Sequence, residues 1–97
     1  MTRFQETMER TFKLLDTYVP VVARVHGAHH PEFHEVRRLF EEIKAKVEAA
    51  GGGQADLARE FAQLRELTDN YKVPGDVCES YAAVYEMLAE LDAAYQA

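Results

Sequence analysis

Residues 4–25, FQETMERTFKLLDTYVPVVARV, decide the fold of this chain. Apolar side chains recur in this stretch at steps of three and four residues, which places them on one face of an α-helix. Thr2 followed by Gln5 has the spacing of a capping box, so we expect the helix to begin there. Gly27 suits the position after the last helical residue, where a left-handed backbone ends many helices. The expected core stripe consists of Phe4, Met8, Phe12, Leu15, Val19, Val22 and Val25.

Three further helices are predicted from the same periodicity. Pro31 suits the first position of a second helix, Gly51–Gly53 ends that helix, and Pro74-Gly75-Asp76 precedes the last one. Because every turn is short, consecutive helices are expected to be antiparallel neighbours. The sequence therefore predicts an all-α, up-down-up-down antiparallel four-helix bundle, with residues 1–97 forming a single domain. The stripes of the last three helices lie within residues 33–50, 57–68 and 77–95.

The composition excludes several classes of function. A net charge of −6 gives no basic patch for nucleic acid or for an anionic membrane surface. No stretch approaches the roughly 20 apolar residues that a membrane span requires. Residues 1–6 carry an acid and lack the apolar run of a signal peptide. Cys78 is the single cysteine, which excludes an internal disulfide and fits a reducing compartment. We therefore expect a cytoplasmic protein.

All four histidines of the chain fall within nine residues, and histidine is the commonest metal ligand. A zinc or iron site needs three or four converging ligands, but Gly27 and Pro31 place the histidines on two different helices. The favoured interpretation is a polar corner, in which one ring caps the second helix, one bonds to a turn carbonyl and one faces water. These roles belong to His30, His26 and His29 respectively. The candidate metal ligands are His26, His29, His30 and His34.

Other reactive side chains have simpler interpretations. Cys78 lies beside the apolar stripe of the last helix, and we expect a small buried hydrophobe rather than a redox thiol. The tyrosines are expected at bundle edges with hydroxyls in water. The acids lie mostly opposite the apolar stripes, and several pair with Lys or Arg, so we expect a solvated face. The tyrosines are Tyr18, Tyr71, Tyr81, Tyr85 and Tyr95; the acids include Glu41, Glu42, Glu86, Glu90 and Asp92.

The first and last helices carry apolar residues beyond those that the core stripe needs. A second apolar face of this kind suggests a homodimer or a surface for a protein partner. No nucleophile, base and orienting group occur together in a catalytic arrangement, so we do not expect an enzyme. The surplus apolar residues are Leu14, Tyr18 and Val21 on the first helix and Cys78, Tyr85 and Met87 on the last.

Several segments carry a resemblance to a known family. Arg24-Val25-His26-Gly27 followed by His30-Pro31-Glu32, residues 64–71 followed by Val73-Pro74 and Cys78, and residues 85–91 resemble the hemerythrin-like domain of the di-iron iron–sulfur-cluster repair proteins. The likeness covers about residues 3–91. It implies a hemerythrin-like four-helix bundle and, in the family, two irons held at one end by single histidines and two His-x-x-x-Glu pairs.

The implied iron ligands are replaced or missing here. No histidine of this chain is followed four residues later by a glutamate. The resemblance places the ligand positions of the first three helices near Gln5, Ala50 and Gln54, and the last pair beyond Ala97. It therefore implies a bundle shortened at its metal end, with Gly51–Gly53 replacing a longer connection.

Two functional interpretations follow. The first is a metal-free hemerythrin-like bundle without a cofactor, which has a structural, regulatory or protein-binding role. The alternative is an iron- or other metal-binding protein of the nitrosative or oxidative stress and iron–sulfur-cluster repair class, in which the four histidines would bind the metal.

Overall fold

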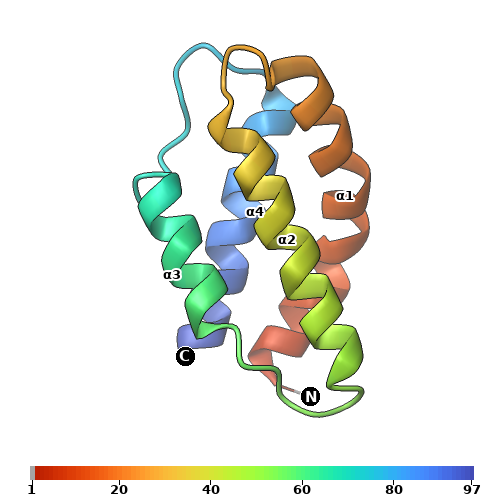
Figure 1. Ribbon diagram of the computed structural model, residues 1–97. Coiled ribbons are helices and arrows are strands. Elements are labelled where there is room, and N and C mark those ends of the chain that lie inside the picture. The colour runs from red at the N-terminus through yellow and green to blue at the C-terminus, as the bar shows by residue number, and fades with distance from the viewer. Residues whose placement is uncertain (1) are drawn as a thin grey trace.

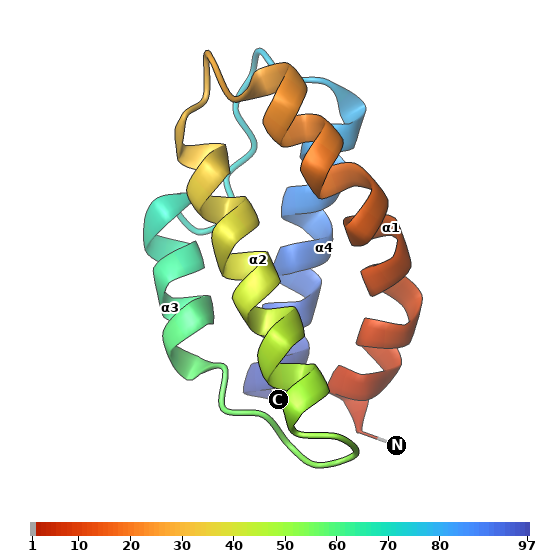
Figure 2. The ribbon, with the colours of Figure 1, turned by 45° about the vertical axis from the view of Figure 1, so that its right-hand side comes forward.

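Figure 1 shows the computed structural model, which describes residues 2–97. Its four helices run alternately up and down. The predicted all-α, antiparallel four-helix bundle is confirmed. Both views place the two termini and the α2–α3 connection at one end, and the α1–α2 and α3–α4 connections at the other (Figures 1 and 2). The helices are α1 (Arg3–His26), α2 (Glu32–Ala49), α3 (Ala58–Leu67) and α4 (Glu79–Gln96).

We name the two ends of the bundle by their residues. The terminal end comprises residues 2–8, 47–57 and 94–97, and the histidine end comprises residues 23–34 and 72–81. None of the helices within residues 2–97 combines the length and apolar character needed to cross a membrane.

The start of α1 is as predicted, but its end is not. The Thr2 hydroxyl accepts a hydrogen bond from the Gln5 amide, and the Gln5 side chain accepts one from the Thr2 amide. Gly27 ends α1 with a right-handed φ of −59°, so the predicted left-handed cap is wrong. Glycine is needed there for space instead. A Cβ at this position would collide with the Ala23 carbonyl oxygen and with the His34 imidazole.

The buried apolar side chains form one cluster to which all four helices contribute. Leu15, Phe40, Phe61 and Leu88 are typical members, each fully buried. Val25 departs from the predicted stripe, because it is 60% exposed. At 100° per residue it lies about a quarter-turn away from the face that holds Leu15. The predicted core stripe of α1 is therefore confirmed as far as Val22 and is wrong at Val25.

α1 makes its most extensive helix contact with α4. Thr7 and Thr11 on α1 are both buried, and each hydroxyl donates to the carbonyl oxygen four residues earlier in the same helix. Their polar groups are thus satisfied without help from a neighbouring helix. Because threonine is small, these two positions allow close packing without leaving an unpaired hydroxyl in the interior.

The α3–α4 connection spans residues 68–78 and is longer than the short turn that the sequence predicts. α3 ends at Leu67, and three successive residues then have positive φ: Asp69, Asn70 and Tyr71. Their φ values of 52°, 62° and 64° lie in the left-handed region, which is unusual for residues other than glycine. The connection carries the chain from the end of α3 back to the histidine end, where α4 begins.

Candidate functional site

His30 connects the start of α2 to the α3–α4 connection. Its Nδ1 lies 3.1 Å from a carboxylate oxygen of Glu32, and its Nε2 lies 3.1 Å from one of Asp76. The hydrogen bond to Glu32 first, and then the contact with Asp76, raise the pKa of His30 above its usual value. The hydrogen bond between Asp76 and His30 in turn lowers the pKa of Asp76. The predicted side-chain cap on α2 is wrong, since α2 has none.

His26 contacts Cys78 rather than the predicted turn carbonyl. Its Nε2 lies 3.1 Å from the sulfur of Cys78, which is the residue before α4. Cys78 is exposed, so the prediction of a small buried hydrophobe is wrong. In the sequence, Cys78 lies next to an apolar stripe. Because α4 begins one residue later, the Cys78 side chain is not part of the helix face that packs into the core.

Tyr81 packs between these two histidines. Its ring centroid lies 5.4 Å from that of His26 and 5.4 Å from that of His30, with edge-to-face geometry in both pairs. Tyr81 and Tyr85 are buried, and their hydroxyls lie 3.2 Å apart. Burial raises the pKa of both tyrosines. The prediction of edge tyrosines with wet hydroxyls is wrong for this pair, and Tyr85 is not part of a second apolar surface.

The four histidines do not converge on a common point. His29 is exposed, as predicted, and His34 packs its ring over Gly27. Both nitrogens of His30 are already directed at carboxylates, so a metal would have to displace one of them. Within residues 2–97, no group of three or more His, Cys, Asp or Glu side chains has the arrangement of a metal site.

Asp92 is a buried charge that the sequence assigned to the solvated face, and that prediction is wrong. It is 4% exposed, accepts from Arg65 at 2.7 Å and accepts from the Tyr71 hydroxyl at 2.7 Å. Burial, followed by the hydrogen bond to Asp92, raises the pKa of Tyr71. This network joins α4 to α3 and to the positive-φ segment after it. Of the other acids, Glu90 pairs with Arg10 at the surface, as expected for a solvated face.

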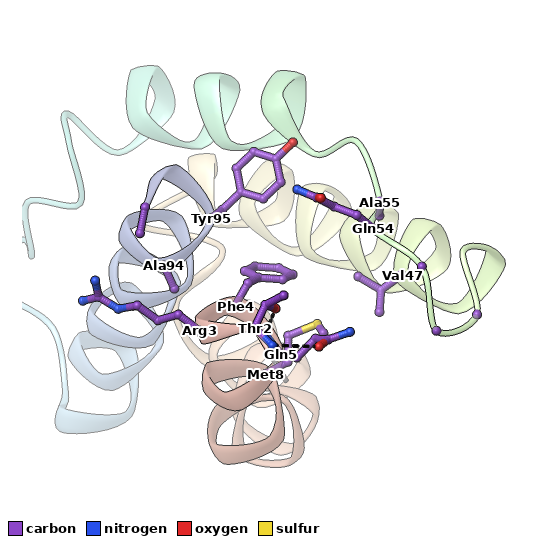
Figure 3. A pocket seen from close by; sticks show the side chains of 14 residues that line it. Thr2, Arg3, Phe4, Gln5, Met8, Val47, Gln54, Ala55, Ala94 and Tyr95 are labelled. Atoms are coloured by element: carbon purple, nitrogen blue, oxygen red, sulfur yellow. Dashed lines mark hydrogen bonds between the residues drawn. The ribbon is translucent and has the colours of Figure 1, made fainter.

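The terminal end contains a cavity of about 370 Å³ between the start of α1, the end of α4 and the connection after α2. Figure 3 shows Phe4, Met8, Val47 and Tyr95 around it, with the Gln54 side chain directed toward Tyr95. Gly51–Gly53 forms part of its wall, and Gly51 has a φ of +60°. Sequence patterns did not identify this cavity, because its residues come from three separated segments.

The positions that the resemblance assigns to iron lie at this end of the bundle. Gln5 and Gln54 both line the cavity, and Ala50 directly precedes its glycine wall. The residues present do not fit a di-iron centre. Neutral amides and a methyl group replace the imidazoles and carboxylates that iron prefers. Among the residues that the structure describes, no side chain lining this cavity is a carboxylate, an imidazole or a thiol.

Comparison with known proteins finds relatives among the iron-sulfur cluster repair proteins. A region of the iron-sulfur cluster repair protein ScdA of Staphylococcus haemolyticus is 27% identical over 122 residues, covering 94% of this chain and 55% of that protein. ScdA of Staphylococcus epidermidis is 22% identical over 120 residues, covering 92% of this chain and 54% of that protein. The chain is a distant homologue of part of ScdA. It spans about half the length of these relatives.

The alignment with the Staphylococcus haemolyticus protein runs over 122 residues, which exceeds the 97 residues of this chain. The relative therefore carries residues inside the aligned region that this chain lacks. No family model matches the chain. No solved structure matches it either.

Proposed function

We propose that this chain is a metal-free, non-enzymatic relative of the ScdA bundle that acts in the cytoplasm as a regulatory or structural protein, through contact with a second copy of itself. The observation that carries the proposal is an apolar stripe on α1, made of Leu14, Tyr18, Val21 and Val25. Leu14, Val21 and Val25 are 46%, 41% and 60% exposed, and Tyr18 is partly buried between them.

The spacing of the α1 stripe favours pairing with another helix. Its members are separated by four, three and four residues, which is the a/d spacing of a two-stranded coiled coil. Arg24 lies on α1 beside the stripe, and exposed Glu86 lies on the adjacent helix α4. A parallel pairing of two copies would bring the basic side of one stripe near the acidic side of the other, so a second copy is the partner that we propose.

The donor chemistry of the terminal end supports the metal-free part of the proposal. Gln5 and Gln54 are neutral, and a carboxamide is a far weaker ligand for iron than a carboxylate or an imidazole. At the histidine end, His30 is held by Glu32 and Asp76, and His26 is held by Cys78. Neither end therefore offers three free donors within residues 2–97.

Sedimentation velocity tests the pairing. We expect the parent chain to form dimers at millimolar concentration, and we expect Val21→Glu and Val25→Glu to remain monomeric because a carboxylate cannot be buried in the stripe without cost. Ala45→Glu adds the same charge at an exposed position of α2 and should dimerise like the parent. A parent chain that is monomeric at every concentration would contradict the proposal.

Metal analysis tests the other half of the proposal. The chain is expressed without an affinity tag in iron-supplemented medium, and its metal content is measured after purification. We expect far less than one metal ion per chain, together with an unfolding midpoint that a chelator leaves unchanged. Near-stoichiometric iron, or a midpoint that falls on chelation, would show that a metal is part of the fold.

A further inference from the structure

The cavity at the terminal end has the size and composition of a small-molecule site. We propose that it binds an uncharged, mainly apolar molecule that carries one hydrogen-bonding group, such as a bicyclic aromatic. Its volume of about 370 Å³ lies at the lower end of the range of ligand pockets, which is roughly 300–1,000 Å³. The proposal goes beyond the proposed function and does not require dimerisation.

Part of the cavity wall is aromatic, and its rings are held by contacts with one another. Phe4 packs edge-on against Phe61 at 6.2 Å and against Tyr95 at 5.7 Å between ring centroids. The hydroxyl of Tyr95 accepts a hydrogen bond from the Leu57 amide, which holds that ring in place. Rings fixed by such contacts lose little entropy when a ligand arrives, so they favour binding of a flat apolar molecule.

Met8 and Val47 add to the apolar surface of the cavity, and Figure 3 shows both among the lining residues. Both side chains are partly buried, pack against the core and line the cavity. A methionine side chain adapts its shape to a ligand more easily than a branched one does. This surface can therefore contact apolar ligands of more than one shape.

The polar groups of the cavity lie near its opening. Gln54 is exposed and lines the cavity, and its amide makes no hydrogen bond to another residue within 2–97. The Gln5 side chain already accepts from the Thr2 amide and keeps its NH₂ group for other contacts. A carboxamide both donates and accepts, so these two side chains suit a hydroxyl, a carbonyl or a ring N–H.

The charges around the cavity favour a neutral ligand. Among residues 2–97, the one ionisable cation lining it is Arg3, whose side chain extends away from the cavity along α4 (Figure 3). Among the described residues that line the cavity, no side chain is a carboxylate that could pair with a cation. The chain carries a net charge of −6, which opposes an anion that lacks a local positive partner. An uncharged molecule meets neither obstacle.

The test uses indole, which is uncharged, aromatic and carries one N–H donor, with benzoate as its charged counterpart. Two-dimensional NMR of the full chain should show saturable shifts at Phe4, Met8 and Val47 as indole is added. We expect a dissociation constant on the order of 1 mM for a probe of this size, and binding of benzoate at least about tenfold weaker, which corresponds to about 1.4 kcal/mol.

Two variants locate the site. Gln54→Trp places a large side chain over the opening at an exposed position, and Val47→Phe fills the cavity from its wall; both should lose the indole shifts. Gln63→Trp is the control for Gln54→Trp: it makes the same Gln-to-Trp substitution on α3, outside the cavity, and should bind indole like the parent. Binding that survives in both cavity variants, benzoate binding as tightly as indole, or no saturable shifts at these residues would overturn the proposal. Sedimentation and metal analysis of the same samples separate this outcome from failure of the proposed function.

Discussion

The imidazole of His30 illustrates how one side chain couples pH to the fold. Its raised pKa means that protonated His30 is stabilised in the folded state relative to the unfolded chain. That contribution is complete below the unfolded pKa of about 6.5 and is lost as the pH rises through the higher folded value. The lowered pKa of Asp76 acts in the opposite sense, because its contribution is lost as the pH falls through that lowered value. Both contributions are therefore present from about pH 4 to about pH 6.5.

We predict that replacing His30 with glutamine weakens the pH dependence of stability. The parent should show a higher urea midpoint at about pH 5.5 than at about pH 8, and His30→Gln should lose part of that difference. His29→Gln is the matched control, because His29 is exposed and one residue away. If His30→Gln keeps the full pH difference of the parent, the contacts with Glu32 and Asp76 do not contribute to stability as described.

Residue-level contacts at the histidine end were beyond reach of sequence reasoning. The sequence showed the histidines as close neighbours along the chain, but the partner of His26 is Cys78, 52 positions away, and that of His30 is Asp76, 46 positions away. Periodicity assigns a residue to a face and says nothing about which remote side chain meets it. This is why the histidine cluster was found and its contacts were not.

Among the helices, α3 and α4 are joined by a buried carboxylate in addition to the packing of Phe61 against Tyr95. Asp92 accepts from Arg65 and Tyr71 at once, and the amide of Tyr71 donates to the Thr68 hydroxyl at 2.8 Å. These bonds hold Tyr71 at a φ of 64°, a conformation that a bulky side chain adopts only when its surroundings enforce it. The same carboxylate thus fixes a helix pair and the unusual segment that ends α3.

We predict that Asp92→Ala destabilises the chain by about 2–3 kcal/mol, because Arg65 and the Tyr71 hydroxyl lose their acceptor in a partly buried site. Glu90→Ala removes a carboxylate from the same helix at the surface, and it should stay within about 0.5 kcal/mol of the parent. Urea unfolding measures both. Equal losses in the two variants would mean that burial of Asp92 does not strengthen its bonds.

The helices themselves were largely predictable, and their ends were less so. The capping box at Thr2 and Gln5 marked the start of α1 correctly, because both partners are local in sequence. The stripe within residues 57–68 predicts the third helix, which ends at Leu67, but nothing in the sequence indicates three left-handed residues without a glycine after it. That conformation depends on tertiary contacts, so a local pattern cannot report it.

For the molecule as a whole, one continuous core predicts one cooperative transition. All four helices contribute to a single buried cluster, with Tyr81 and Tyr85 inside it. We expect unfolding curves followed by tyrosine fluorescence and by far-ultraviolet circular dichroism to coincide. The chain has no tryptophan, so its fluorescence comes from five tyrosines, of which Tyr81 and Tyr85 lie in the core. Curves with separate midpoints would show that one end of the bundle melts first.

The terminal end is where the architecture can be lengthened. A Cβ at Gly51 or Gly52 would meet nothing within 4 Å, and both chain termini lie at the same end as this connection (Figures 1 and 2). Whole helical turns added there, each about 5.4 Å long, would extend the helices without disturbing the packed layers below. For a protein engineer, the histidine end of the bundle would therefore stay unchanged, while the terminal end could carry a longer loop or a rebuilt set of metal ligands.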